Sequence, residues 1–283
     1  MRLTLSQPSS RWFITWLKDP FALLGLVLLL SLSLLALLAP SISPYDPLEV
    51  RYDSLFQPPN AQFFMGTDEL GRDVFSRIMW GGRETLRVSA LATLIGIAGG
   101  LFLGILSGYA GGWLDELIQR LVEIFLAFPT VLLLIAIIAI LGRGLEVILV
   151  AAAIATIPIY TRIIRAVTLS VRHQEFILSS HALGASHGRI LLYHILPNVL
   201  PSALTYATLG LGGIILATSA LSYIGLGAQP PSAEWGAMLN AGRPHLRTAW
   251  WMSVFPGLFV FLAVLSVNLV GDHLRGLLDP RNR

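Results

Sequence analysis

The stretch that organises the chain spans residues 175–198 and reads EFILSSHALGASHGRILLYHILPN, between two strongly apolar segments. Gly184 follows a run of helix-favouring residues, where glycine can close a helix in the left-handed conformation. Ser186 suits the N-cap of a second helix, and Pro197 is expected to end or redirect that helix. The pattern predicts a helix, a tight turn and a second helix at a membrane surface. The alternative is an ordinary loop between two spans.

The composition is that of an integral membrane protein. The 283 residues are 55% hydrophobic and 12% charged, against about 25% charged in a typical soluble protein, and the mean hydropathy is +0.72. The absence of cysteine excludes disulfide, zinc–thiolate and thiol-nucleophile chemistry. The net charge of +3 with a pI near 9.5 favours arginines at lipid headgroups over nucleic-acid binding.

Six apolar segments are candidates to cross a bilayer, which takes about 20 residues. The expected spans are residues 21–39, 88–114, 124–142, 145–163, 199–225 and 250–270. Pro129, Pro158 and Pro256 lie inside three of them, which neighbouring helices can accommodate in a membrane. The fourth span is short, and requires Glu146 and Arg162 to lie at the two headgroup levels. The sequence therefore predicts an all-α, polytopic membrane protein with six transmembrane helices.

The polar segments around the first span invite two further predictions. Residues 1–19 are basic and aromatic at intervals, as at a membrane interface, and the following apolar core exceeds the roughly 7–15 residues of a cleaved signal peptide, so we expect a retained helix. Residues 65–87 suit an amphipathic helix on the membrane surface. Their acidic side chains could form a metal or acid–base cluster, but a solvated face paired with Arg72 and Arg77 is preferred. These acidic residues are Asp68, Glu69 and Asp73.

A stripe of glycines runs through the second predicted span. It consists of Gly96, Gly100, Gly104 and Gly108. Four-residue spacing lines one face of a helix, and residues without side chains let another helix approach closely. The stripe predicts helix packing, and leaves open whether the partner helix belongs to this chain or to another.

The sequence lacks the P-loop with which ATP is usually hydrolysed. A P-loop ends in Gly-Lys followed by Ser or Thr, and the only lysine, Lys18, lies in WLKDP. Ion-coupled carriers usually hold ionisable residues inside their spans, whereas here only Glu123 and Glu146 come close, both at span ends. An energy-supplying partner is therefore more plausible than an ion relay within this chain.

Histidines gather in the organising stretch and just before it. They are His173, His181, His187 and His194. A metal site is one interpretation, but their spacing does not match the His-x-x-x-His pair of a helix. Surface histidines are the preferred interpretation, and no metal site is predicted.

Residues 178–197 resemble the signature of permease subunits of binding-protein-dependent ABC importers: EAA, three residues, Gly and a later Leu-Pro. Leu178-Ser179-Ser180 stands at the EAA position, followed by Gly184 and Leu196-Pro197. The signature's glutamate is here Leu178, both alanines are serines, and Glu175 lies one helical turn earlier. The resemblance implies a short coupling helix, at residues 180–186, that docks into a cleft on an ATPase subunit. The coupling-loop residues are Glu175, Ser179, Ser180, His181, Ala182, Leu183, Gly184, Ala185, Ser186, Leu196 and Pro197.

Longer segments resemble one subfamily, the dipeptide, oligopeptide and nickel permeases. These segments occur in the right order and cover most of residues 60–283. They are similar to the second permease of a pair, the C-type subunit. They read GTDELGRDVFSRIMWGGRETL (66–86), GYAGGWLDELIQRLVEIFLAFP (108–129), LSYIGLGAQPPSAEWGAMLNAGR (221–243) and VNLVGDHLRGLLDP (267–280).

The resemblance implies an ABC type I importer permease fold in a bacterial inner membrane. It implies a second homologous permease, two ATP-binding subunits and an extracytoplasmic substrate-binding protein as partners. ATP and Mg²⁺ would bind to the ATPase subunits, leaving this chain with no cofactor, no catalytic residues and no nucleic acid. An even number of spans and a mild excess of arginine then favour two cytoplasmic termini.

We divide the chain into two parts. Residues 1–64 would hold the interfacial segment, the first transmembrane helix and an extracytoplasmic loop. Residues 65–283 would form the permease core, with five transmembrane helices and the cytoplasmic coupling loop at 165–198.

Peptides are the first choice of substrate, with nickel or glutathione as alternatives, because permeases of this subfamily look alike and specificity lies largely in the binding protein. The competing class is a stand-alone channel or ion-coupled carrier, which would transport without an ATPase and stop when the ion gradient collapses. A membrane enzyme would need a constellation of catalytic residues that the sequence does not offer.

Overall fold

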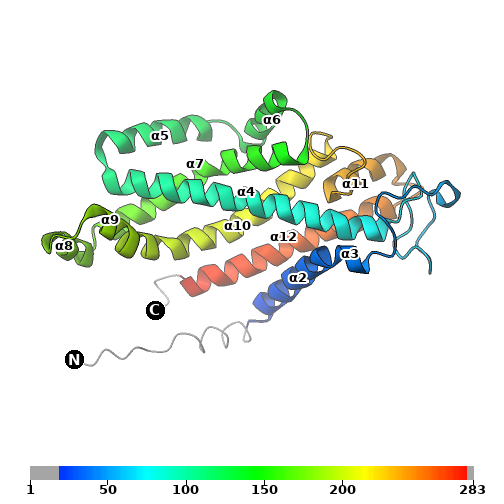
Figure 1. The fold of residues 1–283 in the computed structure, drawn as a ribbon, viewed down its shortest axis with the longest axis horizontal. Coiled ribbons are helices and arrows are strands. Elements are labelled where there is room, and N and C mark those ends of the chain that lie inside the picture. The colour runs from blue at the N-terminus through cyan, green and yellow to red at the C-terminus, as the bar shows by residue number, and fades with distance from the viewer. Residues whose placement is uncertain (1–18, 279–283) are drawn as a thin grey trace.

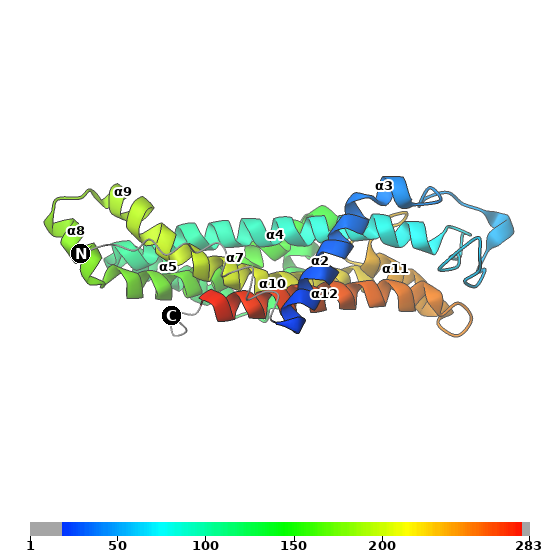
Figure 2. The ribbon, with the colours of Figure 1, turned by 90° about the horizontal axis from the view of Figure 1, so that it is seen from below.

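A computed structural model describes residues 19–278, which fold into helices without a strand. The long helices α4 (Val74–Ala110), α7 (Leu145–Arg172), α10 (Leu196–Tyr223) and α12 (Trp251–Leu278) lie side by side along the long axis of the molecule (Figure 1). Helix α2 (Pro20–Leu37) crosses α4 and α12 obliquely (Figure 2). The prediction of an all-α protein is confirmed.

Five helices among the described residues are long and apolar enough to cross a membrane, and one bent pair of helices is apolar enough when taken together. The five are α2, α4, α7, α12 and the continuous helix that runs from His187 to Tyr223 and contains α10. The pair consists of α5 (Gly112–Leu126) and α6 (Thr130–Leu141), which meet at 90° and make a sixth span if counted together. The structure thus has five candidate spans of the six predicted, and six where the bent pair is counted as one span.

The predicted spans 88–114 and 124–142 leave residues 115–123 as a connection, and this is wrong because these residues form most of α5. This helix buries Ile118 and Val122 on one face, while its charged residues lie on the other, which is the pattern of an amphipathic helix. Pro129 lacks an N–H and stands between the two helices, so the chain breaks there instead of only bending.

The predicted surface helix over residues 65–87 is also wrong, because α4 starts at Val74 and continues without interruption into the second span. Asp73 caps this helix, and its carboxylate accepts a hydrogen bond from the Ser76 N–H at 2.8 Å. Likewise α7 extends to Arg172, so that Arg162 lies within the helix and not at its end, and residues 165–172 belong to a span and not to a loop.

Pro197 does not end a helix, contrary to the sequence prediction. The chain passes from α9 (His187–Ile190) through a π-helical turn (Leu191–Ile195) directly into α10. In this wider turn the Leu196 N–H donates to the Leu191 carbonyl, five residues back. Proline stands at the start of α10, where its missing N–H costs little because the preceding hydrogen bonds are already rearranged.

The end of the molecule opposite α8 (Glu175–Ala182) is a compact cap made by residues 43–73, α11 (Trp235–Gly242) and their connections (Figure 1). Arg72 Nε lies 2.7 Å from Asp68 Oδ2, and Arg77 Nε lies 3.4 Å from the same atom. All three side chains are buried. The predicted local pairing is present, whereas the predicted solvated face is wrong.

Arg77 is buried because it holds two loops of this cap together. Its guanidinium donates to the carbonyls of Pro47, Pro231 and Ser232 at 3.0, 3.4 and 3.1 Å. Buried backbone carbonyls require donors, and a guanidinium can serve several at once. Glu234 caps α11 beside this point, and burial raises the pKa of its carboxyl.

The remaining short elements complete the described chain. They are α3 (Ala39–Ile42), the 3₁₀ turns Tyr52–Ser54 and Arg243–His245, and the capping residue Asp19 of α2. The Asp19 carboxylate lies 3.0 Å from His273 Nδ1 and so joins the start of α2 to the last turns of α12. The rest of the predicted interfacial segment, residues 1–18, lies outside the described residues. The predicted division at residues 64 and 65 stays a prediction.

Candidate functional site

The organising stretch forms a helical hairpin, which we call the α8–α9 loop (residues 175–190), at one end of the molecule (Figures 1 and 2). Gly184 has a φ of +80°, the left-handed conformation expected after a helix. Ser186 caps α9 by accepting a hydrogen bond from the Arg189 N–H at 3.4 Å. The helix placed at residues 180–186 is wrong in its bounds: α8 ends at Ala182, and a non-helical turn follows.

Apolar residues hold the α8–α9 loop against the bundle. Ile177 of α8 and Ile190 of α9 are both buried, and they belong to one cluster with Ile195 of the π-helical turn and Ile164 of α7. The hydrophobic effect therefore fixes the base of the hairpin to the spans on either side.

Polar contacts hold the turn of the same loop. The hydroxyl of Tyr109, in the last turn of α4, lies 2.7 Å from His187 Nδ1 and 3.3 Å from His181 Nε2. These histidines stand on opposite sides of the turn, so α4 is joined to both arms of the hairpin. The six-residue spacing of His181 and His187 did not predict their shared contact with Tyr109, because a turn, and not a helix, brings the two rings together.

The tip of the loop is uncharged and open. Leu183 is 88% exposed, more than any other large hydrophobic residue in the part of the chain that the structure describes. The Ser180 hydroxyl donates a hydrogen bond to the Phe176 carbonyl at 2.7 Å, so its proton is already used within α8. The other predicted coupling residues Glu175, Ser179, Ala182, Gly184, Ser186 and Pro197 are exposed, and Ala185 and Leu196 are half-buried.

This loop has the chemistry of a contact surface. Among residues 19–278 no three histidine, aspartate or glutamate side chains converge as metal ligands would. The tip offers an apolar side chain on a rigid turn, which suits insertion into a partner's pocket.

The glycine stripe faces α7 of the same chain, which is the partner helix that the sequence left open. A Cβ at Gly104 would lie 2.7 Å from Ile164 Cβ, and one at Gly108 would lie 2.8 Å from Thr168 Cβ. A Cβ at Gly96 or Gly100 would overlap Thr156 or Tyr160, respectively. The absence of these side chains brings the two helix backbones into direct contact.

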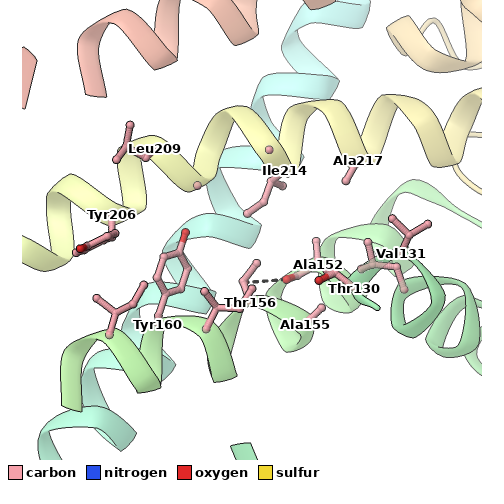
Figure 3. A pocket seen from close by; sticks show the side chains of 15 residues that line it. Thr130, Val131, Ala152, Ala155, Thr156, Tyr160, Tyr206, Leu209, Ile214 and Ala217 are labelled. Atoms are coloured by element: carbon pink, nitrogen blue, oxygen red, sulfur yellow. Dashed lines mark hydrogen bonds between the residues drawn. The ribbon is translucent and has the colours of Figure 1, made fainter. Parts of the chain in front are cut away.

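A groove of about 500 Å³ opens along the bundle between α6, α7 and α10; we call it the α7–α10 groove (Figure 3). It is lined by side chains from residues 130–134, 152–163 and 206–217. Most of them are aliphatic, and the hydroxyl groups come from Thr130, Thr156, Tyr160 and Tyr206. Among the described residues none with a charged side chain lines it.

This groove was not predicted from the sequence. The sequence offers two signals for a groove: small residues that leave space between two spans, and isolated hydroxyl residues among aliphatic ones. The small residues are Ala152, Ala155, Gly210 and Gly213. Such residues are also common in ordinary helix packing, so only the geometry distinguishes a groove from a contact.

Comparison with known families gives two matches. The sequence model described as "Binding-protein-dependent transport system inner membrane component" matches residues 100–283. The model described as "N-terminal TM domain of oligopeptide transport permease C" matches residues 8–59.

Curated proteins similar to the chain include three permeases. The dipeptide transport system permease protein DppC of Alkalihalophilus pseudofirmus is 43% identical over 93% of this chain and 87% of its own length. The di/tripeptide transport system permease protein DppC of Pseudomonas aeruginosa is 39% identical over 99% and 94%. The glutathione transport system permease protein GsiD of Escherichia coli is 42% identical over 97% and 92%.

Among solved structures, a chain of the inward-facing MetNI methionine ABC transporter is similar in fold, with a TM-score of 0.58 and 21% identity. The match covers 71% of this chain and 96% of that one. The described helices therefore have the type I importer permease fold.

Proposed function

The chain belongs to the binding-protein-dependent family of transport system inner membrane components, as a permease subunit of an ABC importer, and we propose that its solutes are short peptides. It is a transport subunit and not an enzyme, and ATP is hydrolysed by partner subunits. The proposed substrate rests on one observation: the chain is similar, over nearly its full length, to permeases named for dipeptides and tripeptides.

The α7–α10 groove supports a peptide over a bare metal ion. We propose that it forms this chain's half of the substrate path. Nickel is held by imidazole, thiolate or carboxylate ligands, and the lining offers hydroxyl groups and aliphatic surface instead. Glutathione is the second candidate, because a relative of similar identity is named for it and because it is itself peptide-like.

We further propose how the subunit is assembled and energised. It pairs with a second, homologous permease and works with two ATPase subunits and an extracytoplasmic binding protein, while ATP and Mg²⁺ bind to the ATPases. The α8–α9 loop docks on an ATPase subunit, and its apolar tip and its attachment to α4 by Tyr109 support this role.

The proposed orientation has both termini and the α8–α9 loop in the cytoplasm of a bacterium. Support comes from the ribbon, in which α2 begins and α12 ends on the side toward α8, away from the α11 cap (Figures 1 and 2). The Asp19–His273 contact holds these two ends together. The natural absence of cysteine makes a test direct: a single Ser186→Cys variant should react with an impermeant thiol reagent only in inside-out vesicles.

The experiment for the function is affinity purification of the tagged chain followed by reconstitution of whatever co-purifies. We expect a second permease and ATPase subunits, and uptake of labelled di- and tripeptides that requires ATP. Uptake of glutathione but not of other peptides would favour the second candidate. Transport by the chain alone, driven by an ion gradient and independent of ATP, would contradict both and support a carrier.

A further inference from the structure

Tyr160 carries a buried hydroxyl without a partner. The residue is 3% exposed, and within residues 19–278 no donor or acceptor is placed to form a hydrogen bond with its oxygen. A buried unpaired hydroxyl destabilises the fold that contains it. Such a group in an otherwise well-packed bundle therefore requires an explanation.

The position of this hydroxyl is fixed by two glycines. A Cβ at Gly100 of α4 would overlap the Cβ of Tyr160, and a Cβ at Gly210 of α10 would overlap its hydroxyl oxygen. In Figure 3 the ring points from α7 toward α10, across the groove that both helices line. The two glycines thus make room for a phenol that places its polar end between the groove's two main walls.

The other hydroxyl groups of the groove differ from it. Thr156 donates to the carbonyl of Ala152 in its own helix at 2.8 Å, Tyr206 is 37% exposed, and Thr130 is exposed. Tyr160 alone among these four combines burial with an unpaired oxygen. Separation of α10 from α7 would uncover that oxygen to a molecule in the groove.

We propose that the Tyr160 hydroxyl hydrogen-bonds to the main chain of the peptide during its passage through the groove. This rests on the proposed function. A phenol can donate and accept, and every residue of a peptide offers an N–H and a C=O. The surrounding groove is apolar and uncharged. The contact therefore recognises the peptide backbone, and leaves selection among side chains to other parts of the importer.

The Tyr160→Phe variant separates this role from a packing role. In the reconstituted importer with saturating binding protein, the number of peptides taken up per ATP hydrolysed should fall about 3–10-fold, the effect of losing one hydrogen bond. The temperature midpoint of unfolding in detergent should rise by about 2–4 °C, because the unpaired hydroxyl is gone. A purely structural hydroxyl would give the opposite change in stability.

Thr168→Val is the matched control. Thr168 lies on the same helix, is fully buried and has an unpaired hydroxyl, but it packs against Gly108 outside the groove. We expect a similar rise in the unfolding midpoint and unchanged peptide uptake per ATP.

Four outcomes are decisive. A lower unfolding midpoint for Tyr160→Phe, or wild-type uptake per ATP, would overturn the proposal while the wild-type importer still carries peptides. Equal losses of uptake in Tyr160→Phe and Thr168→Val would overturn it as well, because the effect would then not belong to the groove. If the wild-type importer carries no peptide, the proposed function itself has failed.

Discussion

Replacing Leu183 with aspartate is expected to weaken binding of the ATPase subunits about 30-fold or more and to reduce uptake accordingly. Leu183 is 88% exposed at the tip of a turn fixed by Gly184 and Ser186. Full burial of a leucine side chain in a partner's pocket is worth about 2 kcal/mol, which corresponds to about 30-fold in affinity. A buried carboxylate in its place adds a desolvation penalty. The measurement is the affinity of purified ATPase subunits for the permease pair in lipid nanodiscs.

The control for this variant is Leu183→Met, which keeps an apolar side chain of similar volume and should bind the ATPase subunits nearly as well as the wild type. Deletion of residues 182–185 should abolish uptake while membrane insertion is preserved, because the anchors Ile177 and Ile190 lie outside the deleted turn. Undiminished ATPase affinity in Leu183→Asp would show that the tip does not dock.

Hydropathy was sufficient to find the spans but not their ends. Bilayer-length apolar runs identify helices in any sequence, yet α4 begins at Val74, in a segment rich in charges. Those charges are neutralised in the cap, where Asp68 pairs with Arg72 and Arg77. A window of sequence cannot show this, because Arg77 also depends on carbonyls of Pro231 and Ser232, far along the chain.

Proline had opposite effects in two places. Pro129 lies inside the third predicted span and interrupts it, because it separates two helices that meet at 90°. Pro197 was expected to stop a helix and instead stands at the second position of α10, after a π-helical turn. The residue removes one hydrogen bond in both cases. The outcome depends on whether neighbouring backbone groups can rearrange, which is a property of the packed structure.

The candidate site was predictable only where its residues are close in sequence. The turn at Gly184 and the cap at Ser186 follow from local rules, and the structure has both. The contact of Tyr109 with His181 and His187 joins residues more than seventy positions apart. The α7–α10 groove is likewise a product of three helices, and no short pattern defines it.

Gly100→Leu is expected to prevent stable packing of α4 on α7, with a loss of about 3 kcal/mol or more, at the upper end of the cost of overpacking a core. A Cβ at this position would overlap Tyr160 Cβ and would lie 3.1 Å from the backbone nitrogen of Thr161. Neither atom can move by a simple side-chain rotation, so the helices must separate. Size-exclusion profiles and unfolding midpoints in mild detergent would measure the effect.

A milder control is Gly99→Ala on the same helix. Its Cβ would lie 3.0 Å from both Cδ1 and Cγ1 of Ile157. Its three nearest atoms are all side-chain atoms, so a small shift of Ile157 should accommodate it and the unfolding midpoint should change little. A wild-type midpoint for Gly100→Leu would show that α4 and α7 are not packed backbone to backbone.

The Gly100→Leu substitution should also weaken the attachment of the α8–α9 loop. The reason is that α4 is one continuous helix, which holds both the face that packs on α7 and Tyr109, the residue that contacts the loop. Partial separation of the two helices would therefore uncouple the loop even where the chain remains folded.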